Sequence, residues 1–139
     1  MVLKLVISDS KGKAWKIESE AESLFGRSIG DKVQGKDIKP EMEGYELEIT
    51  GGSDNAGFPL AKNIEGIGLK KQLLTKGFGM RDSYPGIRRR KTLRGRTIAV
   101  TTSQINLKVI KEGKKFEEIF ADQNQAKSKK PVVAPAPTA

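Results

Sequence analysis

The sequence feature that most constrains the fold is a short alternating segment that runs directly into a cluster of glycines. Apolar and polar side chains alternate through residues 45–50, YELEIT, which is typical of a strand with one buried face. The next nine residues, GGSDNAGFP, hold three glycines, an Asp and an Asn. These residue types favour tight turns, so we expect the strand to end at Gly51 in a tightly wound loop.

Other parts of the chain repeat this pattern of short extended segments between turn signals. Alternating or β-branched residues predict strands over residues 2–8, 13–18, 97–102 and 105–110, with a further short strand within residues 29–35. Residues 67–75, which mix leucines with lysines, are interpreted as a strand, with a helix as the alternative. The first two strands should pair as a hairpin, with Trp15 as a core or rim anchor rather than a base-stacking platform. The sequence therefore predicts a mainly β fold, a small antiparallel β-barrel or sandwich, of which we take the barrel.

Helical signals are few. Ser19 followed by Glu22 resembles a capping box, which predicts a short helix over residues 20–25 that stops near Gly26. A second short amphipathic helix is expected over residues 114–121. The fold class is thus a barrel with one or two short helices.

The composition changes near the C-terminus. Residues 123–139 contain three prolines and no aromatic residue, so they cannot build a core and should form an extended tail. We expect residues 1–122 to be one domain and residues 123–139 to be its Pro/Ala-rich tail. No run of about 18 apolar residues exists and the N-terminus does not resemble a signal peptide, so no membrane partner is expected.

Two residue types are missing altogether, and their absence excludes several kinds of chemistry. The chain has no cysteine, so there is no disulfide and no thiolate metal site. It has no histidine either, which removes the commonest general base and the commonest metal ligand. Neither a cofactor nor a metal is expected.

The positive charge is concentrated in the middle of the chain. Residues 1–60 carry eight Lys and Arg against eleven Asp and Glu, whereas residues 61–96 carry eleven Lys and Arg against two acids. A one-sided field of this kind is typical of a surface that binds a polyanion. A merely solvated loop would mix both signs, so nucleic acid is the favoured partner.

The predicted RNA-binding residues come from this stretch. Basic side chains would neutralise phosphates, and two flat rings, Phe78 and Tyr84, could stack on bases. We expect most of them to lie in a glycine-rich loop that follows the strand over residues 67–75. The basic candidates are Lys62, Lys70, Lys71, Lys76, Arg81, Arg88, Arg89, Arg90, Lys91, Arg94 and Arg96.

Asp54 is the one carboxylate for which chemistry needs to be weighed. An Asp in a glycine-rich loop most often bonds the backbone amides of its own loop. The alternative is an RNA-processing enzyme or nuclease in which Asp54 and Asp82, or another carboxylate, hold a divalent metal. The missing histidine and the lack of clustered acids weigh against that alternative. A third hypothesis, binding to a membrane surface or another acidic partner, is disfavoured because the basic stretch is not an amphipathic helix.

Two motifs resemble a known family. Residues 49–60 resemble the signature of small-subunit ribosomal protein six of the archaeal and eukaryotic type, which is unrelated to its bacterial namesake. Residues 90–95, RKTLRG, are similar to the Arg-Lys-Ser-Val-Arg-Gly segment of that family. Leu60 stands where the family usually has Met. The signature Gly-Gly-x-Asp-x-x-Gly-x-Pro is matched by Gly51, Gly52, Asp54, Gly57 and Pro59.

The resemblance covers roughly residues 1–113 and implies a structural role. It implies a small barrel held on ribosomal RNA of the small subunit, beside neighbouring ribosomal proteins, in the cytoplasm. Eukaryotic members carry a long basic C-terminal helix with phosphorylated serines, whereas this chain ends in a short Pro/Ala tail. Kinase regulation is therefore not carried over, and the chain is similar to the archaeal form.

Overall fold

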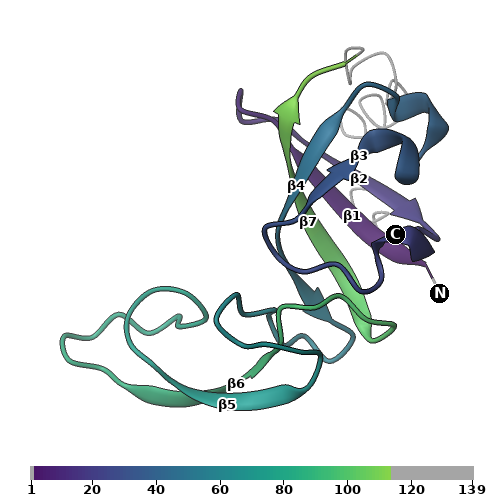
Figure 1. Cartoon of the computed structure of the whole chain (residues 1–139). Coiled ribbons are helices and arrows are strands. Elements are labelled where there is room, and N and C mark those ends of the chain that lie inside the picture. The colour runs from purple at the N-terminus through teal and green to yellow at the C-terminus, as the bar shows by residue number, and fades with distance from the viewer. Residues whose placement is uncertain (1, 114–139) are drawn as a thin grey trace, which may run out of the picture.

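In the computed structural model of the chain, residues 2–113 are described. They form a five-stranded sheet and, beside it, a separate two-stranded ribbon (Figure 1). The strand order in the large sheet is β2-β1-β7-β4-β3. The strands are β1 (Leu3–Ser8), β2 (Ala14–Ser19), β3 (Lys32–Gln34), β4 (Glu46–Asp54), β5 (Leu69–Leu74), β6 (Arg89–Arg94) and β7 (Thr102–Lys111).

The prediction of a mainly β fold is confirmed, but the prediction of an antiparallel barrel is wrong in two respects. The late strand β7 inserts between β1 and β4 and runs parallel to β1, so the sheet is mixed. Its edge strands, β2 and β3, do not pair with each other, and residues 2–113 contain no closed barrel. Sequence patterns around each strand could not show this, because the β1–β7 pairing joins residues about a hundred positions apart.

One face of the sheet carries the main core. Leu3, Leu5 and Ile7 of β1 are buried while Lys4 is exposed, as the alternation predicts. The other central strands follow the same rule, and Trp15 is buried on β2, as predicted. The core residues from β4 and β7 are Leu47, Ile49, Ile105, Leu107 and Val109.

Short turns, and no long helix, cover this face within the described residues. Three single 3-10 turns occur: η1 (Glu22–Leu24), η2 (Gly35–Asp37) and η3 (Pro40–Met42). The helix expected over residues 20–25 is reduced to η1, and the capping box does not form. The Ser19 hydroxyl instead donates to the carbonyl oxygen of Ile38, 3.3 Å away. Leu24 and Met42 from these turns close the core. The helix expected over residues 114–121 lies outside the described residues.

The glycines of residues 51–52 lie inside a strand, which corrects the expected loop. Strand β4 continues to Asp54, with irregularities in its pairing to β7 on either side of Gly51 and Gly52. A Cβ at Gly52 would lie 2.4 Å from the carbonyl oxygen of Gln104 on β7, so only glycine allows the two backbones to approach this closely. The tight turn begins later, where Gly57 has a φ of +91°.

The strand expected over residues 97–102 is also wrong. Ile98 is buried and exchanges backbone hydrogen bonds with residues 26 and 27, but it belongs to a connection, not to a strand. The chain turns at residues 99–102, where the Thr102 hydroxyl accepts a hydrogen bond from the amide of Ala99 (3.2 Å). Thr102 then begins β7, so this strand starts three residues earlier than the one predicted over residues 105–110.

Residues 61–96 form a projecting ribbon, called the arm below. Strands β5 and β6 pair antiparallel over their whole length and extend away from one end of the sheet (Figure 1). The arm has only a small core of its own, made by Ala61, Ile64 and Leu93 with Leu74 packed against them. The rest of the described chain, residues 2–60 and 97–113, is called the sheet body.

Candidate nucleic-acid interface

Most basic side chains of the arm are exposed and have no acidic partner. Three are paired within residues 2–113: Arg89 with Asp82 (3.1 Å), Arg94 with Asp54 and Arg96 with Glu65 (3.8 Å). No carboxylate of the described chain pairs with the remaining eight. Those eight are Lys62, Lys70, Lys71, Lys76, Arg81, Arg88, Arg90 and Lys91, and all except the partly buried Lys91 are exposed.

The basic run that was expected to lie in a loop is largely a strand. Arg89, Arg90 and Lys91 belong to β6, where they lie opposite Leu74, Leu73 and Gln72 of β5. Because side chains alternate across a ribbon, Arg90 points to one face and its neighbours to the other. The charges are therefore spread over both faces of a two-stranded ribbon instead of being gathered in one flexible loop.

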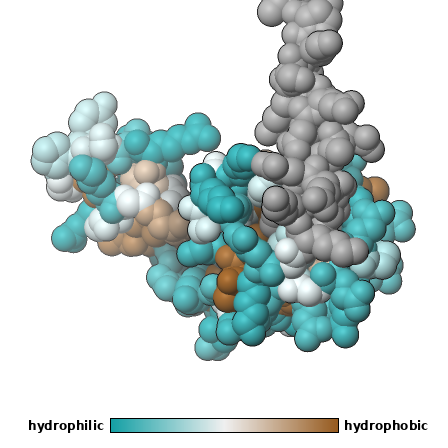
Figure 2. Space-filling view, turned by 90° about the horizontal axis from the view of Figure 1, so that it is seen from above, coloured by the Kyte–Doolittle hydropathy of each residue, from teal (hydrophilic) through white to brown (hydrophobic). Residues whose placement is uncertain are grey.

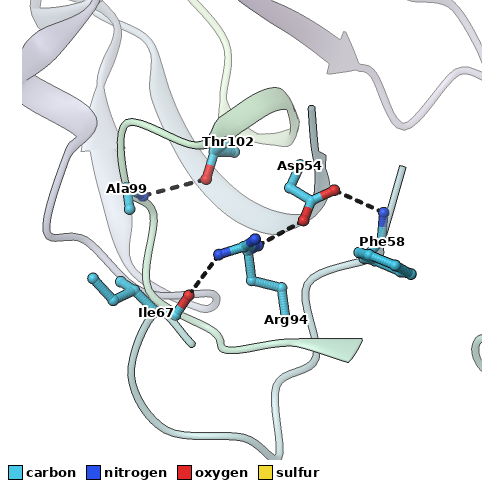
Figure 3. Close-up of polar contacts among 6 residues, drawn as sticks. All are labelled: Asp54, Phe58, Ile67, Arg94, Ala99 and Thr102. Carbon is cyan, nitrogen blue, oxygen red and sulfur yellow. Dashed lines mark hydrogen bonds and ion pairs between the residues drawn. The ribbon is translucent and has the colours of Figure 1, made fainter. Parts of the chain in front are cut away.

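Asp54 and Arg94 join the arm to the sheet body. The Arg94 Nε lies 2.6 Å from Asp54 Oδ2, and the backbone amide of Phe58 donates to Asp54 Oδ1 at 2.8 Å (Figure 3). Arg94 Nη1 also donates to the carbonyl oxygen of Ile67 (2.9 Å). The side chain of Asp54 is fully buried and that of Arg94 is 13% exposed. The joint thus links the end of β4 to the end of β6 and to Ile67, which lies just before β5.

The charge state of Asp54 follows from these contacts. Burial alone would raise the pKa of the Asp54 carboxyl, because it disfavours the charged form. The hydrogen bond and the positive charge of Arg94, with the amide of Phe58, outweigh burial and lower the pKa below its ordinary value. Asp54 is therefore a charged anchor, held by its own loop amide as well as by Arg94.

Backbone hydrogen bonds strengthen the same joint. The amide of Arg94 donates to the carbonyl oxygen of Pro59 (3.0 Å), and the amide of Ala61 donates back to the carbonyl oxygen of Arg94 (2.9 Å). The next residue, Gly95, crosses the other side of the arm's base so closely that a Cβ would meet the backbone of Gly66 at 1.9 Å. Glycine is thus required at position 95 by close approach and not by a turn.

The two aromatic candidates lie in different settings on the arm. Phe78 is 61% exposed and sits between Gly77 and Gly79, both with positive φ, in a turn closed by the amide of Met80 on the carbonyl oxygen of Gly77 (3.1 Å). Tyr84 is 69% exposed and lies in the long connection between β5 and β6. Apolar surface is visible on the arm in Figure 2, amid hydrophilic side chains.

A cleft of about 260 Å³ lies where the arm meets the sheet body. Arm residues on one side and Ile29 and Thr50 of the body on the other line it, and Lys62 and Phe78 are the only predicted RNA-binding residues among the lining. Sequence reasoning missed two further lining residues, Asn63 and Gln72. Isolated amide side chains carry no sequence signal, so only their placement in space could reveal them.

Neither of the carboxylates considered for metal chemistry is available as an isolated ligand. Asp54 pairs with Arg94, and Asp82 pairs with Arg89 on the surface of the arm. Residues 2–113 contain no group of three or more acidic side chains placed to hold a metal ion. No helix in that part of the chain is long and apolar enough to cross a membrane.

Comparison with known proteins gives a consistent result. The family model described as ribosomal protein S6e matches residues 3–121. A protein of Methanococcus maripaludis, named small ribosomal subunit protein eS6, is 45% identical over 114 residues, which cover 81% of this chain and 90% of the relative. The protein of the same name from Methanothermobacter thermautotrophicus is 44% identical, over 86% of this chain and 96% of the relative. The one from Archaeoglobus fulgidus is 41% identical, over 90% of this chain and 100% of the relative.

Proposed function

Because the chain belongs to the ribosomal protein S6e family, and is therefore a structural, non-enzymatic protein of the small ribosomal subunit, we propose that its arm is the surface that holds ribosomal RNA. The observation that carries the proposal is the set of eight basic side chains of residues 61–96 that no carboxylate of the described chain neutralises. Unpaired cations on a projecting ribbon repel one another unless a polyanion lies between them.

The shape of the arm supports the same proposal. A two-stranded ribbon with charges on both faces can be approached by phosphates from two sides. The sheet body, in contrast, places several of its exposed cations beside acids: Lys32 and Lys111 both pair with Glu46, at 3.4 Å and 3.3 Å, and Lys16 lies 3.8 Å from Glu18. The arm therefore has the larger unpaired positive charge to offer to RNA.

Three of the predicted residues have contacts within the protein that set them apart. Arg94 is held by Asp54 and by the carbonyl oxygen of Ile67, so we assign it a structural role at the joint. Arg89 and Arg96 have surface partners that an RNA phosphate can replace, since exposed ion pairs contribute little. The eight unpaired residues are proposed as the phosphate-binding set, and neighbouring ribosomal proteins as the remaining partners.

The proposal is tested by ultraviolet cross-linking of native small subunits, with the cross-linked peptides of this chain identified by mass spectrometry. We expect the RNA-linked peptides to come mainly from residues 61–96. Cross-links that come mainly from residues 2–60, with none from the arm, would contradict the proposal. Peptides from that acidic part of the body provide the internal control, because they are digested and detected in the same sample.

A further inference from the structure

We propose that the cleft between the arm and the sheet body binds one unstacked nucleobase of RNA, with Phe78 as its stacking surface. The inference rests on the proposed RNA binding by the arm and goes beyond it, because phosphate contacts alone require no cleft. Its volume, about 260 Å³, suits a single flat ring system with some surrounding space and is too small for a base-paired helix.

The floor and wall of the cleft are apolar. Leu60 and Leu93 are both 1% exposed and form a rigid floor, because Leu60 belongs to the main core and Leu93 to the arm's own core. Leu74 and Phe78 line the cleft from the arm. Phe78 is the exposed member of this group, and its glycine-flanked turn holds the ring at the cleft without burying it. A flat, exposed ring next to an apolar floor is the arrangement that stacks on a base.

Polar groups stand where the edge of a base would need them. Asn63 and Gln72 line the cleft, and no side chain or backbone group of residues 2–113 forms a hydrogen bond with either side-chain amide. An amide offers both a donor and an acceptor, which is what the edge of a nucleobase requires. Lys62, also at the cleft, is unpaired and can contact the phosphate of the same nucleotide.

Charge favours a nucleotide over a protein side chain as the occupant. Residues 61–96 have eleven basic and two acidic side chains, so the cleft lies in a strongly positive region. An apolar side chain from a neighbouring protein would gain nothing from that charge and would offer no hydrogen bond to Asn63 or Gln72. A nucleotide satisfies the apolar floor, the two amides and the cation together.

The experiment compares the binding of the full chain to two RNA hairpins at one fixed salt concentration. One hairpin carries a single unpaired nucleotide in its stem, and the other has the same stem fully paired. We expect the wild-type chain to prefer the first hairpin, and Phe78→Ala to reduce that preference by roughly fivefold to a hundredfold, as loss of one stacked base implies. Phe78→Leu, which keeps the apolar contacts but not the flat ring, should lose most of it as well.

Tyr84→Ala is the matched control, because Tyr84 is an exposed aromatic residue of the arm that does not line the cleft. Melting temperatures show that each variant is folded, and Phe78→Leu serves if Phe78→Ala is not. A preference that Phe78 and Tyr84 variants alter equally, or that neither alters, would overturn the inference. If the wild type binds both hairpins but Arg88→Ala with Arg90→Ala leaves its affinity for them unchanged, the proposed function itself fails. If the wild type binds both hairpins equally well, the nucleobase site in the cleft is rejected, but RNA binding by the arm is not.

Discussion

The sheet body and the arm are both built from short strands, but they differ in how much apolar surface those strands bury. In the body, alternating strands place Leu5, Leu47 and Leu107 in one shared core, so each strand is held by several others. In the arm, two strands share a core of only a few side chains, and Leu69 and Leu73 remain half or more exposed. An isolated two-stranded ribbon is marginally stable in water, so the arm depends on its attachment to the body.

Because of this difference, we expect the body to determine the folding stability of the protein and the arm to determine its RNA affinity. The body has its apolar core and several paired surface charges, whereas the arm carries unpaired cations on a ribbon that depends on the body for its stability. The joint between Asp54 and Arg94 is where the two regions depend on each other. Substitutions in the body should therefore change the free energy of unfolding, and substitutions on the arm should change RNA affinity.

The largest effect on stability is expected from truncating a leucine of the body. Leu107→Ala removes a fully buried side chain from the middle of β7 and should lower the free energy of unfolding by roughly 3 to 5 kcal/mol. Leu73→Ala is the matched change on the arm, where the side chain is 62% exposed, and should cost less than about 1 kcal/mol. Urea unfolding followed by circular dichroism measures both. Equal losses would mean that the arm is as tightly packed as the body.

The next largest effect is expected at the joint. Asp54→Ala leaves Arg94 without its buried partner and should cost about 3 kcal/mol, while the RNA affinity of the folded fraction falls much less. Asp82→Ala breaks an exposed pair of the arm and should cost less than about 1 kcal/mol. Thermal melts and binding titrations on the same samples separate the two quantities. Normal stability of the Asp54 variant with lost RNA affinity would show that Asp54 serves binding instead.

The pH dependence of this effect has a defined sign. The folded-state pKa of Asp54 is lowered, so its stabilising contribution is complete above the unfolded-state pKa of about 3.9 and is lost as pH falls through the lower folded-state value. The difference in melting temperature between wild type and Asp54→Ala should therefore be constant near neutral pH and shrink in acid. A difference that grows as the pH falls would contradict the ion pair.

Local sequence patterns predicted some features of the fold and failed at others for physical reasons. The strands β1, β2 and β4 alternate clearly, as does β7 from residue 105, and that alternation indicates their buried faces. The glycines at 51–52 indicated a turn because glycine usually does, but here they allow β4 to pass closely beside Gln104 of a strand far along the chain. A requirement imposed by a distant backbone leaves no local pattern.

The same limit applied to the candidate interface. The excess of basic residues in 61–96 was visible in the sequence, but its placement on a strand was not, because β6 is exposed on both faces along much of its length and shows no apolar period. The partner of Asp54 was also hidden, since Arg94 lies forty residues away and belongs to the same basic stretch as the proposed RNA contacts. Only the structure distinguishes this arginine, which is paired with a buried carboxylate, from the unpaired cations of the same stretch.

The smallest effect is expected from removing the tail. Deletion of residues 123–139 should change the free energy of unfolding by less than about 0.5 kcal/mol, because a segment with three prolines, no aromatic residue and only two large apolar side chains, Val132 and Val133, contributes little to a core. A thermal melt of the shortened chain is sufficient. A clear fall in melting temperature would show that the segment packs on the rest of the chain.

The most direct test of the division between body and arm is the salt dependence of RNA binding. Arg88→Ala with Arg90→Ala removes two unpaired charges of the arm, and Lys4→Ala with Lys108→Ala removes two exposed charges of the sheet. Small-subunit ribosomal RNA is titrated with the wild type and with each of the two folded variants over a series of salt concentrations. We expect the arm variant to weaken the slope of log affinity against log salt by roughly 0.7 to 0.9 per lost contact, about 1.6 in all, and the sheet variant to leave it unchanged. An unchanged slope for the arm variant, or an equal change for the sheet variant, would contradict the account.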